Sequence, residues 1–284
     1  GHAVTLQLAN TRVTVGEKAL GALTISNPTS RRLRAALVEL RVGAGANSFL
    51  CPALSQDESH EEVFAIATTR RGIVAVGPAS TIRGDGLGLV RRVQTWSEAT
   101  ELYIHPHTVA MNASTVGFIR DIEGATTQDL SSADVSFHAL REYVPGDDRR
   151  AIHWRSTARI GKLMVRQFEE TRRSHLLIVL DLDTDAWASD EEFEIGVSAA
   201  ASMARAALVD AKEVSVHTQV GHLKTPTPMH AMDSLSGVER VLGAERINAL
   251  TQRAGTEASH ASTAVVISGS RTRLASNLFL SSLF

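Results

Sequence analysis

The chain has 284 residues, of which 43% are hydrophobic and 21% are charged, and its formal net charge is −2. This composition is that of a globular protein long enough for two domains, and it excludes a largely disordered chain. A charge so close to zero argues against nucleic acid or an anionic membrane surface as a partner held by bulk electrostatics.

The first part of the chain, up to about residue 108, alternates between apolar and polar residues. The alternation is clear in residues 4–8 and 38–42, and a period of two is typical of strands with one buried face. Turn-forming residues such as Gly77-Pro78 separate these runs. Many short strands without a long helical pattern predict an immunoglobulin-like β-sandwich over residues 1–108, with no cysteine pair to link its sheets.

Two stretches of this half resemble functional sites only superficially. Gly84-Asp85-Gly86-Leu87-Gly88 has alternate glycines, but no lysine and no helical pattern follow it. We therefore expect a hairpin turn there and not a phosphate-binding loop. His105 and His107 have no cysteine or carboxylate at ligand spacing, and we expect them to be exposed bystanders and not metal ligands.

A connecting segment, residues 109–173, joins the two halves of the chain. From Leu140 onward it carries nine basic and five acidic residues, a net charge of +4, together with one tryptophan and one tyrosine. A plain linker would be small, polar and repetitive. This composition therefore indicates a folded segment with a role of its own.

The local structure of the segment can be predicted from its turn and helix signals. Pro145-Gly146 predicts a turn, after which Asp147 or Asp148 could cap a short helix over residues 150–159. Residues 161–166 then have the pattern of a strand. The expected unit is a turn, a short helix and a strand.

Two roles are open for this segment. As a structural staple between the domains, its arginines would form bidentate ion pairs with acids such as Asp147, and Trp154 would insert between the domains with an arginine stacked on its face. As a docking surface, it would present exposed cations such as Arg172 to a protein or to phosphate. Nucleic acid is disfavoured because acids interrupt the basic residues and aromatics are few. The candidate partner-binding or interdomain residues are Arg141, Tyr143, Asp147, Arg150, Trp154, Arg155, Arg159, Lys162 and Arg166.

From residue 174 the pattern changes to alternating strands and helices. His175–Leu180 is a continuous apolar run, typical of a strand buried on both faces. Residues 191–211 carry an apolar helical stripe, and Asp190 is the expected N-cap. We expect a strand, a helix and a strand at residues 214–220, 235–250 and 264–268. This order predicts a parallel α/β sheet with flanking helices over residues 174–284.

The first strand of this half ends in acidic residues. Asp181, Asp183 and Asp185 lie at the carboxyl end of the strand, where open sheets bind ligands, and alternate carboxylates could hold Mg²⁺. The von Willebrand factor A fold carries an Asp-x-Ser-x-Ser metal motif at this place, but here two aspartates replace its serines. Ser268-Gly269-Ser270 also stands where a further aspartate is expected. A solvated acidic loop is the favoured interpretation, and a metal site is the alternative.

The connecting segment resembles the signature of the domain of unknown function 58 family. Upstream, Arg70-Arg71-Gly72 and Gly77-Pro78 also resemble the family pattern, whereas Gly86-Leu87 departs from its Pro-Phe. The resemblance covers residues 70–185. The matching signature residues are Arg141, Tyr143, Gly146, Asp147, Arg150, Ile152, His153, Trp154, Thr157, Ala158, Arg159, Gly161, Leu163, Arg166 and Glu169.

The resemblance implies an architecture and a cellular setting. Members of the family are usually bacterial, with a two-helix membrane anchor ahead of a β-sandwich, the signature segment and a von Willebrand factor A-like (Rossmann-type) domain. They are typically encoded beside a MoxR-type AAA+ ATPase, and a chaperone-like role toward client proteins is commonly proposed. No catalytic reaction is established for the family, so the resemblance supplies no catalytic residue.

These observations predict a non-enzymatic adaptor or assembly factor for a MoxR-type ATPase, without a cofactor. The alternative is a metal-dependent enzyme, or adhesion-type binding through Mg²⁺, centred on Asp181, Asp183 and Asp185. No apolar run approaches the roughly 20 residues of a membrane-spanning helix, and the single cysteine, Cys51, fits a reducing compartment. The chain is therefore expected to be soluble, and the resemblance to the family implies that it is part of a longer protein anchored at the cytoplasmic face of a bacterial membrane by a segment outside this sequence.

Overall fold

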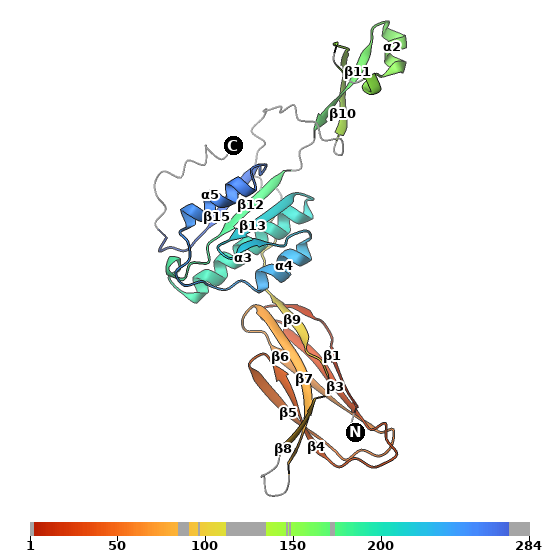
Figure 1. Ribbon diagram of the computed structural model, residues 1–284, viewed down its shortest axis with the longest axis vertical. Helices are drawn as coiled ribbons and strands as arrows, with labels where there is room; N and C mark the ends of the chain where they lie inside the picture. The colour runs from red at the N-terminus through yellow and green to blue at the C-terminus, as the bar shows by residue number, and fades with distance from the viewer. Residues whose placement is uncertain are drawn as a thin grey trace.

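The computed structural model describes residues 3–84, 91–95, 97–111, 135–145, 147, 149–170 and 174–272. Along its long axis, Figure 1 shows a β-sandwich at one end, an α/β domain in the middle and a small hairpin unit at the other end. None of the helices in these residues is both long and apolar enough to cross a membrane.

The amino-terminal domain consists of two β-sheets packed face to face. One sheet has the order β1-β3-β6, and the other has the order β2-β9-β7-β4-β5, with β8 paired to β7. Its strands are β1 (Ala3–Leu8), β2 (Arg12–Thr14), β3 (Lys18–Ser26), β4 (Ala36–Val42), β5 (Gly45–Cys51), β6 (Ser59–Ala67), β7 (Gly72–Gly84), β8 (Arg91–Thr95) and β9 (Thr100–His105).

The core of the sandwich follows from the alternation in the sequence. In β3, Leu23 and Ile25 face inward and are fully buried, while in β4 the inward residues are Val38 and Leu40. Both pairs belong to one continuous apolar cluster, so the two sheets share a core as a sandwich requires. The predicted β-sandwich is therefore confirmed. The turn expected after Gly84 falls on residues outside those described, although β7 and β8 pair antiparallel on either side of it.

The α/β domain has a four-stranded sheet of order β14-β13-β12-β15, in which β12, β13 and β15 are parallel. Helices α3 and α4 share a core with one face of β12, and α5 shares a core with the other. Burial on both faces explains the uninterrupted apolar sequence of β12. The elements are β12 (His175–Leu180), η2 (Thr184–Ala186), α3 (Asp190–Val209), β13 (Glu213–Thr218), β14 (Gly221–Leu223), α4 (Pro228–Ser236), α5 (Ile247–Glu257) and β15 (Thr263–Ile267).

Two predictions for this domain were wrong. The single helix expected over residues 235–250 is replaced by the end of α4 and the start of α5, with Gly243 in a left-handed conformation between them (φ +64°). The N-cap of α3 is Ser189 and not Asp190, because the Ser189 side chain accepts a hydrogen bond from the Glu192 amide. A hydroxyl at this position satisfies one of the free amides of the first turn.

The hairpin unit contains the elements β10 (Val135–Glu142), η1 (Arg149–Ala151), α2 (Trp154–Ile160) and β11 (Met164–Glu170). Strands β10 and β11 pair antiparallel, with Arg141 opposite Val165. The short helix α2 ends at Gly161, whose φ of +75° is the left-handed conformation that glycine adopts without a Cβ clash. This unit holds the signature residues of the connecting segment.

Candidate functional site

The hairpin unit is the first candidate site, because it carries most of the residues singled out in the sequence. Among those of its side chains that the structure describes, the buried ones are Ile152, Met164 and Val165, and no residue of α2 is buried. An amphipathic helix normally buries an apolar face against its own protein. Helix α2 therefore presents an unpartnered surface.

Trp154 is the clearest departure from expectation. Its side chain is 65% exposed on α2, so the expectation that it inserts between the domains was wrong. The helix that carries it packs on β11 of its own hairpin, and the cation–π contacts of the described residues involve other aromatic rings. A large exposed aromatic side chain is a marker of binding surfaces.

Charged pairs hold the turn of the unit in place. Arg141 and Asp147 form a bidentate pair, with distances of 2.7 Å from Nη1 to Oδ2 and 2.6 Å from Nη2 to Oδ1. Asp147 also accepts a hydrogen bond from the Val144 amide. The bidentate pair confirms the geometry expected of Arg141, but the cap prediction for Asp147 was wrong. The N-cap of α2 is His153, whose side chain accepts from the Ser156 amide.

The other candidate residues lie around this pair. Tyr143 is half-buried, and its amide donates to the Leu163 carbonyl. Lys162 pairs with Glu142 at 2.6 Å on the exposed side. Exposed candidates lie in η1 and on α2, and they are Arg150, Arg155 and Arg159. Arg166 lies on β11 with its side chain outside the described part, as is the whole of Arg172.

The Arg141–Asp147 pair makes a titration prediction. Hydrogen bonds from Arg141 and from the Val144 amide lower the pKa of Asp147 to about 2. A lowered folded-state pKa means that the pair stabilises the unit above the ordinary carboxyl range and that this contribution is lost as the pH falls through about 2. We expect side-chain carboxyl NMR to report that midpoint, and Arg141→Gln to move it toward the ordinary value of about 3.9.

The matched control for this titration is Lys162→Gln, which removes a cation of the same unit that pairs elsewhere, with Glu142. It should leave the midpoint of Asp147 unchanged. A midpoint near 3.9 in the parent chain would show that the pair does not form in solution.

A contact between the sandwich and the α/β domain centres on Arg71. Its side chain is 3% exposed and its Nε lies 2.8 Å from Oε2 of Glu194 in α3. Nη1 donates to the carbonyl oxygens of Leu235, Ser236 and Val238 at the end of α4, at 3.2, 3.1 and 2.6 Å. Burial lowers the pKa of Arg71, and Glu194 opposes that shift. The staple between the domains is therefore built on Arg71, at the amino end of β7.

A second interdomain contact involves Asp233 of α4. Arg12 donates to it in a bidentate manner at 2.8–3.2 Å, and His105 Nε2 lies 2.8 Å from its Oδ1. Burial alone would raise the pKa of Asp233, but the hydrogen bonds from Arg12 and His105 hold the pKa below its ordinary value. The expectation that His105 is an exposed bystander was wrong, since it is half-buried in this contact.

The acidic end of β12 has a hydrogen-bonding role within the fold. Asp181 is 1% exposed, and its Oδ1 accepts from the Asp183 amide at 3.0 Å and from Gln219 Nε2 at 2.6 Å. Its Oδ2 accepts from Ser268 Oγ at 2.6 Å. Asp183 caps η2 by accepting from the amide of Asp185, whose own side chain is exposed. The alternative interpretation, a metal triad of these three aspartates, is not favoured, because both oxygens of the buried Asp181 carboxylate accept hydrogen bonds from neutral donors.

A different set of possible metal ligands lies at the opposite edge of the sheet. Within the described part of the chain, one group of three or more His, Cys, Asp or Glu side chains has all its ligand atoms within 4.8 Å of one another, namely His175, Glu213 and His260. Sequence inspection missed this group because its members are far apart in the chain. The available signal was that each stands at or just before the start of a predicted strand.

Comparison with known proteins bears mainly on the second half of the chain. The family described as protein of unknown function DUF58 matches residues 139–269. The uncharacterized protein YeaD of Bacillus subtilis is 24% identical over 176 residues, which are 59% of this chain and 41% of YeaD. The chain therefore spans less than half of the length of this relative.

Solved structures resemble the chain only weakly. The CARDB domain of the PF1109 protein from Pyrococcus furiosus matches 37% of the chain and 92% of its own length, at 14% identity and a TM-score of 0.29. The putative ApaA protein from Bordetella pertussis matches a similar share at 12% identity and a TM-score of 0.25. Likenesses of this level say nothing about function. Residues 139–269 of the chain are therefore similar to the DUF58 family, and YeaD is a distant relative.

Proposed function

We propose that the protein is a non-enzymatic adaptor that docks onto a MoxR-type AAA+ ATPase through the surface of its hairpin unit. The observation that carries the proposal is helix α2, which buries none of its residues and leaves Trp154 65% exposed. A structural staple would bury this ring, and the contacts between the domains are made by other residues. The exposed surface of α2 therefore favours a docking role over a role as a structural staple.

The apolar part of this surface is larger than one side chain. Ile160 and Leu163 are also exposed near the end of α2, and Val144 is exposed in the turn beside β10. Tryptophan and arginine are the residues most enriched where interfaces gain their binding energy. A patch with an aromatic centre therefore suits a protein partner.

The charged rim of the surface indicates the chemistry of that partner. Arg155 and Arg159 lie on exposed positions of α2, and the exposed Lys162 lies two residues after its end. Cations around an apolar centre match a partner patch with acidic residues around an apolar pocket. The resemblance to the family supplies the identity of the partner, a MoxR-type ATPase, and the role in assembling client proteins.

The same resemblance supports the finer description of the α/β domain and of its location. We propose that the domain is of the von Willebrand factor A-like type, and this proposal is supported by the three parallel strands with helices on both faces of the sheet. The proposed location is the cytoplasmic face of a bacterial membrane, with an anchor outside this sequence. A metal-dependent role at Asp181 is not favoured, since hydrogen bonds from neutral groups reach both of its carboxylate oxygens.

Binding to a purified MoxR-type ATPase from the same cell tests the proposal. We expect Trp154→Ala to weaken binding by about 30-fold, the loss of a central interface residue worth about 2 kcal/mol. Reversing charge in Arg155→Glu/Lys162→Glu should weaken binding more at low salt than at high salt. Both variants should unfold like the parent, because all three side chains are exposed.

The matched control is Arg32→Glu/Arg34→Glu, which makes the same charge change on exposed positions of the sandwich. It should bind the ATPase as the parent does. Equal binding by Trp154→Ala and by the charge-reversed hairpin variant would remove this surface from the interface. A parent chain that binds no such ATPase would refute the adaptor role itself.

A further inference from the structure

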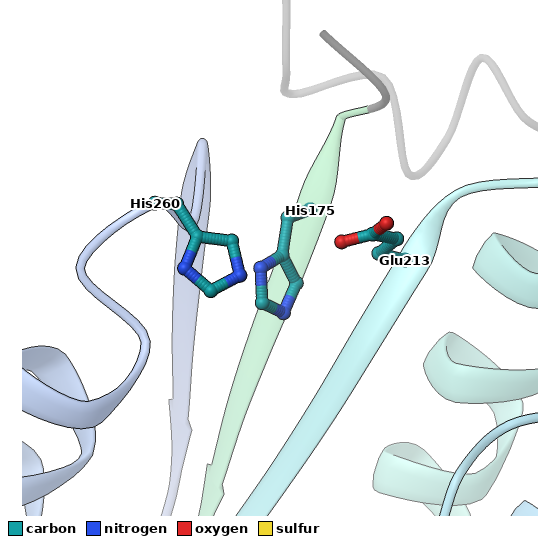
Figure 2. Close-up of side chains that lie close together, drawn as sticks. All are labelled: His175, Glu213 and His260. Carbon is teal, nitrogen blue, oxygen red and sulfur yellow. The ribbon is translucent and has the colours of Figure 1, made fainter. Parts of the chain in front are cut away.

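The amino-terminal edge of the parallel sheet gathers three potential metal ligands. His175 begins β12, Glu213 begins β13 opposite it in register, and His260 lies just before β15. Parallel strands start at one edge of a sheet, so the strand order β13-β12-β15 brings the three residues together. Figure 2 shows the His175 ring between the His260 ring and the Glu213 carboxylate.

The surroundings of His175 orient its ring and leave one ring nitrogen free to bind a metal ion. The residue is 4% exposed, and its Nε2 lies 2.8 Å from Oγ of Ser215. Its Nδ1 is buried and has no hydrogen-bond partner in the protein. A buried polar atom without a partner is uncommon and calls for an explanation. With the ring proton on Nε2 donated to Ser215, the lone pair remains on Nδ1, and such a hydrogen bond is how proteins orient a metal-binding imidazole.

The second histidine strengthens this assignment. The rings of His175 and His260 lie 4.5 Å apart between centroids, at an interplanar angle of 39°. Burial lowers the pKa of His175, and the neighbouring His260 lowers it further.

We propose that His175, Glu213 and His260 bind one zinc-type divalent cation. Two imidazole nitrogens and one carboxylate oxygen are a donor set used for Zn²⁺, whereas Mg²⁺ and Ca²⁺ prefer oxygen ligands alone. Ligands of a tetrahedral zinc ion lie about 3.4 Å from one another when the bonds are about 2.1 Å. The ligand atoms of the three residues lie within 4.8 Å of one another, and Glu213 and His260 are exposed, so their side chains would have to turn only slightly toward His175 to reach a shared ion.

The proposed site has room for a fourth ligand, and an ion bound there would link the starts of two strands. The three residues line a cavity of about 660 Å³, and His222 and Lys224 also line it. His175 also follows β11 of the hairpin unit by only a few residues in the chain. A bound ion would tie the starts of β12 and β13 to the turn before β15, next to the point where the chain enters from the hairpin unit.

Zinc titration of the tag-free, EDTA-treated chain tests this site. We expect isothermal titration with ZnCl₂ to show one saturable site per chain, and His260→Ala and Glu213→Gln each to weaken it at least about tenfold. Tenfold is the lower end of the loss caused by removing a residue that only orients a ligand. Both altered side chains are exposed, so thermal unfolding without metal should match the parent and show that the variants fold. Co²⁺ should give the visible absorption of a four-coordinate ion in the parent alone.

Two histidine variants serve as controls. His222→Ala removes a histidine that lines the same cavity but lies outside the group, and His107→Ala removes an exposed histidine of the sandwich. Both should bind Zn²⁺ as the parent does. The proposal is overturned if the parent shows no saturable site, if the two ligand variants bind like the parent, or if His222→Ala causes the larger loss.

Discussion

Replacing Arg71 by alanine is expected to lower the free energy of unfolding by about 3–5 kcal/mol, the range for removing one partner of a buried ion pair. The guanidinium supplies the hydrogen bonds to three carbonyl oxygens at the end of α4 and the ion pair with Glu194. It also lies over the Phe193 ring, 5.3 Å from the centroid. Alanine would leave the three carbonyl oxygens without this buried donor, whereas the Glu194 side chain, which is 32% exposed, could turn to water.

The measurement is equilibrium unfolding in urea, and the matched control is the neighbouring residue. Arg70→Ala removes an exposed cation beside Arg71 and should change the stability by less than about 0.5 kcal/mol. Arg71→Lys keeps the charge but loses the planar fork, so it should recover only part of the loss. An Arg71→Ala variant as stable as the parent would show that the sandwich and the α/β domain are not joined by this side chain.

The architecture was largely predictable because each half of the chain has a clear period. Alternating residues such as Leu23 and Ile25 occupy the buried face of β3, and the run from His175 to Leu180 becomes β12 over the same residues. Helix boundaries were less certain where a glycine stops one helix shortly before the next begins. The pattern over residues 235–250 looked continuous because α4 and α5 both place apolar residues on their buried faces.

The contacts that define sites were much harder to predict, because they join residues remote in sequence. Arg71 stood out within the family-like motif, but its partners at the end of α4 lie more than 160 residues away. Grouping His175 with His260 requires the strand order of the sheet, which no local pattern contains. The burial of Trp154 was predicted wrongly, since large aromatic side chains are usually buried and here the ring is exposed.

The carboxylate of Asp181 should prove important for stability and not for binding Mg²⁺. Asp181→Ala removes the acceptor of three hydrogen bonds, from the Asp183 amide, the Gln219 amide group and the Ser268 hydroxyl. Each buried donor left without an acceptor costs about 1–3 kcal/mol, and Gln219 and Ser268 can partly recover by turning to water. We expect a total loss of about 2–4 kcal/mol in the free energy of unfolding.

A control variant and a measurement with Mg²⁺ distinguish a structural role of Asp181 from a metal-binding role. Asp185→Ala removes an exposed carboxylate of the same acidic stretch, and its effect should stay below about 0.5 kcal/mol because its backbone amide still donates to the capping side chain of Asp183. Millimolar Mg²⁺ should leave the melting temperature of the parent unchanged, since a ligand stabilises a protein only by binding its native state. A rise in the parent that disappears in Asp181→Ala would instead establish a magnesium site, because only an ion held by that carboxylate produces both results.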